Sequence, residues 1–275
     1  MANGISIHIG LNRVDPIHYE GWNGALVACE FDAKDMQAIA KKRGYKDTLL
    51  LTQDATAQNV INAITAAAKA LKSGDQLFLT YSGHGGQVPD KNGDEPDSQD
   101  ETWVMYDREL IDDELYALWA KFKKGVRILM LSDSCHSGSV AKVVQIHNAI
   151  RANEAAVDAP RFRAMPMDKQ AVVYRKHKKL YDGIQKRTVA GDKAKVNASV
   201  ILVSGCLDNQ LSGDGDRNGL FTGTLLTVWN SGKFKGSLNK FAMTIRSQMP
   251  PWQSPNYFKV GAPNAAFEKT KPFTL

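Results

Sequence analysis

Short apolar runs alternate with amphipathic segments along the 275-residue chain. Each run is continuously apolar rather than alternating in polarity, which predicts strands buried on both faces. The runs are ISIHIGL (5–11), TLLLT (48–52), DQLFLTYSG (75–83), VRILMLS (126–132) and SVILVSG (199–205).

The segments between these runs carry apolar residues at helical spacing. The first set is Leu26, Cys29, Ala33, Met36 and Ala40, before Gly44; the second is Val60, Ile64, Ala68 and Leu71, between a Thr56 cap and Gly74. Strands and helices in alternation predict an α/β fold with a mostly parallel central sheet and helices on both faces. Two further helices are expected after the last strand, at about 220–231 and 237–249.

The segment from 142 to 195 differs from the rest of the chain. It has no clean period, contains Pro160 and Pro166, and holds thirteen Lys and Arg against five Asp and Glu. We interpret it as a long basic surface linker inside a single domain, residues 1–275. The linker, placed at 142–197, separates an N-terminal part (1–141) from a C-terminal part (198–275).

Composition narrows the possible functions. The net charge is +6, but outside the linker segment 22 basic residues face 24 acidic ones, so we expect no nucleic-acid binding. No apolar run approaches the roughly 20 residues that span a bilayer, and no basic leader precedes the first one. Three cysteines in a chain of this length suit a reducing compartment. We therefore expect a cytoplasmic protein with no membrane partner.

Two polar clusters follow two of the predicted strands. YSGHGG (81–86) contains His84, and SDSCHSG (132–138) contains Cys135. Reactive groups in parallel sheets gather beyond the carboxyl ends of the strands, so both clusters are expected at one edge. A cysteine thiolate is a strong nucleophile that needs a base nearby, and His84 is the candidate. His136 is a weaker candidate, because neighbours along an extended chain point to opposite sides.

Other chemistries fit less well. No G-x-S-x-G elbow supports a serine nucleophile, and no C-x-x-C or H-E-x-x-H spacing supports a zinc site. Cys29, on an apolar helix stripe, and Cys206, at a strand end, are interpreted as packing thiols.

These motifs resemble the caspase superfamily of cysteine peptidases. A strand ending in His-Gly is followed by D-S-C-H-S-G, whose cysteine lies 51 residues after the histidine; this is the form found in metacaspases and their prokaryotic relatives. GISIHIGL, VSGCLDNQLSGDG and NGLFTGTLL extend the similarity over nearly the whole chain outside the linker. The resemblance implies a catalytic pair of His84 and Cys135, with the backbone N–H groups of Cys135 and Gly85 holding the oxyanion.

The resemblance also implies a substrate pocket lined by Asp32, Ser82 and Asp133. Two carboxylates there would favour an Arg or Lys side chain and exclude an acidic one, so we expect cleavage of protein or peptide substrates after Arg or Lys. Similar enzymes process themselves between their two parts. We expect self-cleavage in the basic linker, at RFR (161–163), YRKHKKL (174–180) or QKR (185–187), and a linker that blocks the cleft until cut.

The resemblance to calcium-dependent metacaspases implies a metal site at Asp100, Asp112 and Asp113. Those enzymes have a fourth carboxylate at the position where this chain has Lys142. An ammonium opposes a divalent cation, so we expect no required cofactor, with calcium as the open alternative. The acidic loop 90–101 is not an EF-hand, because Glu95 stands where that loop needs Gly. The resemblance favours a monomer. The alternative function is a non-catalytic scaffold or calcium-binding regulator with this fold.

Overall fold

The computed structural model describes residues 2–93, 95–135, 161–188, 194–207, 210 and 212–275. A six-stranded sheet has the order β11-β9-β7-β3-β1-β2 and is parallel except for its edge strand β11. Its strands are β1 (Gly4–Gly10), β2 (Lys46–Leu51), β3 (Gln76–Ser82), β7 (Arg127–Asp133), β9 (Ser199–Ser204) and β11 (Asn256–Gly261). The predicted α/β class with a mostly parallel sheet is confirmed, and the five predicted strands are all present.

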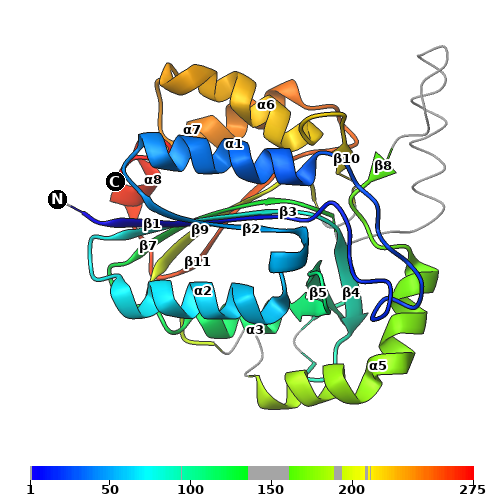
Figure 1. Ribbon diagram of the computed structural model, residues 1–275. Coiled ribbons are helices and arrows are strands. Elements are labelled where there is room, and N and C mark those ends of the chain that lie inside the picture. The colour runs from blue at the N-terminus through cyan, green and yellow to red at the C-terminus, as the bar shows by residue number, and fades with distance from the viewer. Residues whose placement is uncertain (1, 94, 136–160, 189–193, 208–209, 211) are drawn as a thin grey trace, which may run out of the picture.

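Helices cover both faces of this sheet (Figure 1). One face carries α1 (Cys29–Lys42), α6 (Leu220–Trp229) and α7 (Leu238–Gln248), with α8 (Ala265–Glu268) beside them; the other carries α2 (Ala57–Ala70) and α3 (Asp112–Trp119). Each layer encloses its own apolar core: strand residues such as Ile7 and Leu79 pack with the α2 side, and Phe78 and Leu129 pack with the α1 side. Continuous apolar strands are the sequence signature of this two-sided burial.

Local sequence signals set the helix ends. The Thr56 side chain accepts a hydrogen bond from Asn59 N at 3.1 Å and caps α2, as predicted. Gly44 follows α1 with φ of +83°, a conformation that glycine adopts without strain. No helix among the described residues is both long and apolar enough to span a bilayer.

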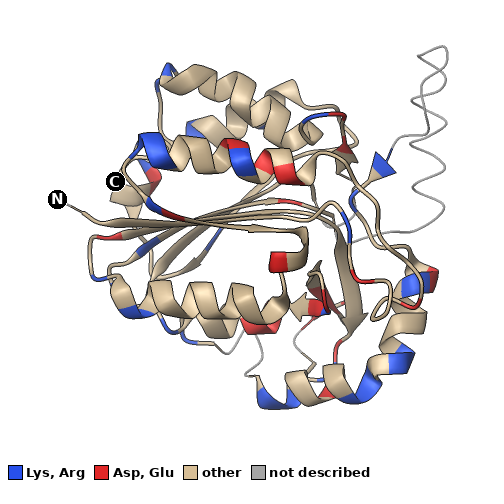
Figure 2. Ribbon diagram, viewed as in Figure 1, with Lys and Arg blue, Asp and Glu red and all other residues tan. Residues whose placement is uncertain are grey.

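The expectation that the linker lacks regular structure is wrong for its described part, although most of its Lys and Arg residues are exposed, as expected. Residues 161–187 form a short strand, β8 (Arg161–Phe162), and a 21-residue helix, α5 (Met167–Arg187), with an irregular turn at His177. The helix could not be predicted from periodicity, because its apolar positions are few among many basic ones. Their helical phase is also interrupted at His177. Figure 2 shows Lys and Arg along α5, while its buried side packs against β4.

Two small sheets lie at the end of the molecule where the two polar clusters were expected. β4 (Gly85–Pro89), β5 (Gln99–Val104) and β6 (Glu109–Ile111) form an antiparallel sheet, and β8 pairs with β10 (Gly213–Asp214). Both lie beyond the carboxyl ends of β3 and β7 (Figure 1). They extend the edge at which the two polar clusters were expected.

Candidate active site

The sheet register brings the two polar clusters together. In the parallel pair of β3 and β7, Ser82 lies opposite Asp133. His84 and Cys135 each follow two residues later, so both lie at the same sheet edge. Ser82 and Asp133 themselves remain in the last paired position, where buried side chains point toward α1 and α6. His136, the other candidate base, lies outside the described residues.

The His84 imidazole is held by a loop that precedes α1. Its Nε2 lies 3.0 Å from the carbonyl oxygen of Gly24, and Trp22 packs on the ring with centroids 4.8 Å apart. A carbonyl only accepts, so Nε2 carries the proton and Nδ1 is left with a lone pair. Burial lowers the pKa of His84 to about 4, which keeps the ring neutral at pH 7. A neutral imidazole with a free lone pair can accept a thiol proton.

Two backbone N–H groups converge on one carbonyl oxygen at this edge. Gly85 N and Cys135 N donate to the carbonyl oxygen of Arg163 at 3.0 and 3.2 Å. On either side, Arg163 N donates to Ser212 O at 2.9 Å and Met165 N donates to Gly85 O at 2.8 Å. The backbone around Arg163 is thus fixed across the site by pairing with β10 before it and by a bridge to Gly85 after it, with its carbonyl directed at paired donors.

The Arg163 guanidinium fills the predicted acidic pocket. It is fully buried and contacts Asp32, Ser82, Asp133 and Asp214. The contacts are Nη2 to Asp32 Oδ2 (2.7 Å), Nη1 to Ser82 Oγ (2.8 Å), Nη1 to Asp133 Oδ2 (2.9 Å), and Nη2 and Nε to Asp214 Oδ1 (3.0 and 3.3 Å). Burial opposes the charged guanidinium, but the carboxylates outweigh it and raise the pKa of Arg163 above its ordinary value.

Backbone and hydroxyl donors hold the pocket carboxylates in place. Asp133 accepts from Thr222 N (3.0 Å) and Thr222 Oγ1 (2.7 Å) in the first turn of α6, so it also caps that helix. Asp32 is buried, and its Oδ1 accepts from Gly219 N at 3.1 Å. Burial raises the pKa of Asp32 to about 6 although Arg163 lowers it. Of the pocket carboxylates, Asp32 is therefore the one whose charge depends on pH just below neutrality.

Cys135 is fully buried, but its cover is not the main core. The apolar cluster around it contains Cys206, with Phe162 and Ala164 packed against it. Phe162 and Ala164 flank Arg163 in the same segment that crosses the site. The thiol is thus closed off by a short piece of the chain itself.

Sequence reasoning missed several contributors to this site. Gly24, Ser212 and Asp214 come from loops or very short strands whose patterns carry no signal for a site, and Arg163 was interpreted as an exposed basic residue. Gly24 has φ of +54°, and a Cβ there would lie 3.1 Å from His84 Cδ2, so a larger residue would be strained at this position. Only the fold reveals that Gly24 contacts His84 and that the Arg163 carbonyl accepts from Cys135 N. It also reveals that Ser212 and Asp214 bind Arg163.

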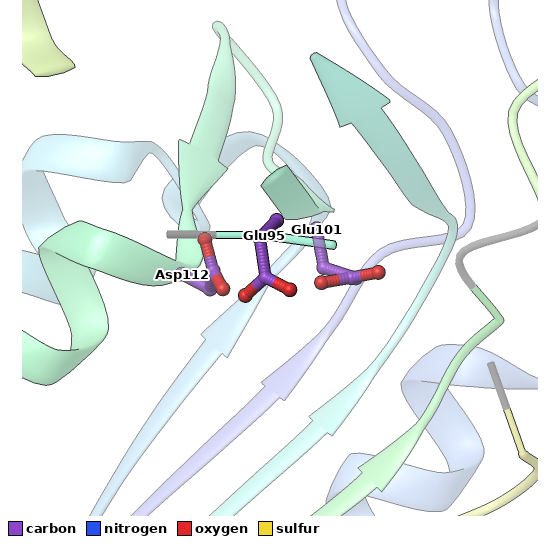
Figure 3. Close-up of side chains that lie close together, drawn as sticks. All are labelled: Glu95, Glu101 and Asp112. Carbon is purple, nitrogen blue, oxygen red and sulfur yellow. The ribbon is translucent and has the colours of Figure 1, made fainter. Parts of the chain in front are cut away.

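A second acidic cluster lies at the start of α3. Carboxylate oxygens of Glu95, Glu101 and Asp112 lie within 4.8 Å of one another (Figure 3). Three hard oxygen donors suit a divalent cation such as Ca²⁺. Of the three predicted ligands, Asp112 belongs to this trio, Asp100 is buried on β5, and Asp113 accepts a hydrogen bond from Asn92 at 2.6 Å. Lys142 lies outside the described residues.

The pKa of Asp112 is raised to about 9, first by burial and then by the nearby carboxylates Glu101, Asp100 and Asp113. A bound cation would relieve this repulsion by replacing the proton. The donor set therefore fits the metal that the resemblance implies, through a partly different group of residues.

Comparison with known proteins gives the family. Residues 14–266 match the family described as the caspase domain. Metacaspase-1 of Mycosarcoma maydis is 30% identical over 261 residues, covering 85% of this chain and 63% of the relative. Metacaspase-1A of Aspergillus fumigatus is 31% identical over 268 residues, covering 84% of this chain and 62% of the relative.

Solved structures show the same fold. The crystal structure of protein GSU0716 from Geobacter sulfurreducens is 53% identical with a TM-score of 0.90, covering 99% of this chain and 98% of that one. Caspase-1 from Spodoptera frugiperda has the same fold at a TM-score of 0.53 and 10% identity, covering 94% of this chain and 86% of that one. On the caspase-domain match and the metacaspase similarity together, the chain belongs to the caspase family of cysteine peptidases.

Proposed function

We propose that this protein is a cysteine endopeptidase that hydrolyses peptide bonds after Arg or Lys and processes itself in the basic linker. One observation carries the proposal: an arginine side chain fills the acidic pocket while its own carbonyl oxygen accepts hydrogen bonds from Gly85 N and Cys135 N. A substrate residue before a scissile bond has to meet both requirements at once, since its side chain gives specificity and its carbonyl is attacked.

In the proposed reaction, Cys135 attacks the carbonyl carbon after His84 Nδ1 accepts the thiol proton. The two backbone N–H groups stabilise the oxyanion, and each such donor is worth about 3 kcal/mol in comparable enzymes. His84 then gives the proton to the leaving amine, and water hydrolyses the thioester. Gly24 acts through His84: its carbonyl fixes the tautomer and the orientation of the ring.

The proposed specificity follows from charge. An acidic substrate side chain would have no cationic partner in a pocket lined by Asp32, Asp133 and Asp214. Burying an unpaired charge in this way costs several kcal/mol. Asp214 also contacts Arg163 Nε, an atom that lysine lacks. Lysine can satisfy the pocket charge, but with fewer hydrogen bonds, so we expect arginine to be preferred.

The test is the hydrolysis of fluorogenic peptides that end in Arg, Lys or Asp before the reporter. Wild type is expected to cleave the Arg peptide fastest and the Asp peptide not at all. Cys135→Ala and His84→Ala should each lower kcat by at least about 10³-fold. Cys206→Ala, which removes a neighbouring buried thiol, should retain activity and serves as the matched control.

Failure of every variant, including wild type, to cleave any of these peptides in a folded state would contradict the proposal. That result would favour the alternative of a non-catalytic scaffold or calcium-binding regulator, for which the carboxylates of Glu95, Glu101 and Asp112 would be the working site. Cleavage after Asp would contradict the pocket assignment alone.

A further inference from the structure

We infer that the bond cut in self-processing is Arg163–Ala164, and that residues 161–165 inhibit the uncut chain by occupying its own active site as a substrate would. This inference rests on the proposed peptidase function and adds the bond, the inhibitor and the fate of the two fragments. Among the basic residues of the described linker, Arg163 is the one whose side chain and carbonyl both reach the site.

The segment makes the contacts of a bound peptide on both sides of Arg163. Before it, Phe162 and Arg161 pair antiparallel with Gly213 and Asp214. After it, Ala164 bridges to Gly85, with Met165 N donating to Gly85 O at 2.8 Å. These bonds use the strand edges that an external peptide would need, which is the usual way a protein binds an extended ligand.

The same segment blocks access. Arg163 has no exposed surface and occupies all three pocket carboxylates, and its carbonyl uses both oxyanion donors. Phe162 and Ala164 pack against Cys135, which is fully buried. An external substrate therefore cannot bind until Arg163 and the residues before it leave.

The cleavage requires only groups of this chain and one water molecule. Cys135 Sγ bonds to the Arg163 carbonyl carbon while His84 takes the thiol proton; the C–N bond to Ala164 then breaks, and His84 protonates the departing nitrogen. Water hydrolyses the Arg163 thioester, which returns the thiol and leaves a carboxyl group on Arg163 and a new amino terminus at Ala164.

The two sides of the cut are anchored very differently. Residues after Ala164 lead into α5, where Val173, Tyr181 and Ile184 are buried and the Gln185 side chain bonds to Pro89 O at 3.1 Å and Lys91 N at 2.8 Å. Residues before it are held by the two-residue pairing of β8 and by Arg163 itself. The segment that ends at Arg163 is thus the one that leaves, while the new amino terminus stays docked.

The fragments are expected to remain together after the cut. β7, from the N-terminal fragment, pairs with β9, from the C-terminal fragment, in the middle of the sheet. Fragments 1–163 and 164–275 should therefore co-elute in gel filtration and separate on a denaturing gel.

The experiment follows purified full-length chain over time by intact mass and by N-terminal sequencing, with an arginine peptide reporter in parallel. Wild type should yield a fragment beginning at Ala164, and reporter activity should rise with the same time course. Arg163→Ala should remain uncut at this bond yet cleave the reporter without a lag. Arg163→Lys, which retains the charge, should be cut at the same bond at least fivefold more slowly. The matched control Arg175→Ala removes an exposed linker arginine and should behave as wild type.

Three results would overturn the inference: a first fragment that begins elsewhere, Arg163→Ala chains cut as fast as wild type, or uncut wild type as active as Arg163→Ala. Each of these leaves the proposed peptidase intact if reporter cleavage still depends on Cys135. If Arg163→Ala fails to fold, the Arg163→Lys rate and the wild-type fragment sequence decide the matter. If no folded variant cleaves the reporter or itself, the proposed function is contradicted.

Discussion

Two clusters of acidic side chains in this molecule differ in what lies beside their carboxylates. In the pocket at the end of β3 and β7, three buried carboxylates surround the guanidinium of Arg163. At the start of α3, the charges that act most strongly on Asp112 are carboxylates. Burial raises the carboxyl pKa in both, but only to about 6 for Asp32 against about 9 for Asp112. The difference follows from the cation: Arg163 lowers the pKa of Asp32, whereas Glu101, Asp100 and Asp113 raise that of Asp112.

The comparison indicates what each cluster is suited to bind. The pocket is shaped by fixed donors, with Ser82 and the backbone of Gly219 orienting Asp32 around a planar cation. The trio of Glu95, Glu101 and Asp112 is made of carboxylates close together, which suits a compact metal ion. Removing the positive charge from the pocket should therefore destabilise the protein. Adding a cation to the trio, or removing one of its negative charges, should stabilise it.

The largest effect is expected from Arg163→Ala, measured in a Cys135→Ala background so that the chain stays uncut. Removing the cation leaves three buried carboxylates without a countercharge, and breaking a buried pair in this way costs about 3–5 kcal/mol of unfolding free energy. Urea unfolding at pH 7 measures the loss. Arg175→Ala in the same background should change the free energy by less than about 0.5 kcal/mol. Equal stability of the two variants would show that the pocket does not need its cation.

Asp214 should tune the choice between arginine and lysine. Its Oδ1 accepts from both Nε and Nη2 of Arg163, and the Nε contact is unique to arginine. Asp214→Asn is expected to lower kcat/KM for arginine peptides about tenfold more than for lysine peptides, a difference of about 1.4 kcal/mol. The ratio of the two constants is the measurement. A proportional loss for both peptides would assign Asp214 a purely structural role.

Affinity for an arginine ligand should depend on pH through Asp32. The pKa of about 6 applies with a guanidinium bound; in an empty pocket the pKa is higher, because the lowering charge is absent. As pH falls toward 6, binding must first remove a proton, so affinity drops by up to tenfold per pH unit and levels off below 6. Calorimetry of N-acetyl-arginine amide with the Arg163→Ala, Cys135→Ala protein measures this. A constant affinity from pH 8 to pH 6 would contradict it.

Asp112→Asn should stabilise the protein at alkaline pH. The folded-state pKa of about 9 lies above the ordinary value of 3.8, so ionisation costs stability that grows as pH rises from about 4 to 9. Asn retains the Oδ1 that accepts from Asp113 N at 2.9 Å but removes the charge. We expect Tm to rise by about 2–4 °C at pH 8 and to be unchanged at pH 4. Asp97→Asn, at an exposed acid of the neighbouring loop 90–101, is the control and should shift Tm at neither pH.

The smallest effect is expected from chelation. Peptide cleavage by the processed protein should change less than about twofold in excess EDTA, because no reacting group belongs to the trio of Glu95, Glu101 and Asp112. Calcium should nevertheless raise the Tm of wild type at pH 8, where it replaces the proton on Asp112, and should not do so in Asp112→Asn. Loss of cleavage in EDTA, restored by calcium, would mean that the trio controls the site.

Much of the fold could be predicted because its signals are local. The five parallel strands contain continuous apolar runs, four of them buried and the edge strand β2 partly exposed, and the helices between them begin and end at residues such as Thr56 and Gly44. His84 and Cys135 follow two such strands, so their place at one edge was predictable as well. The antiparallel edge strand β11 and helix α5 were not, because a half-exposed strand and a basic helix with few apolar positions carry weak periodicity.

The sequence by itself determined the fold class, the edge at which the chemistry gathers, and the candidate groups His84, Cys135, Asp32, Ser82 and Asp133. Only the tertiary structure decided which cation meets those acids. Charge patterning along the chain marked the linker as basic and exposed, whereas folding buries one of its arginines among three carboxylates that come from separate elements, α1, β7 and β10. A buried charge is stable where opposite charges surround it in space, and that arrangement depends on contacts between residues 30 to 131 positions apart.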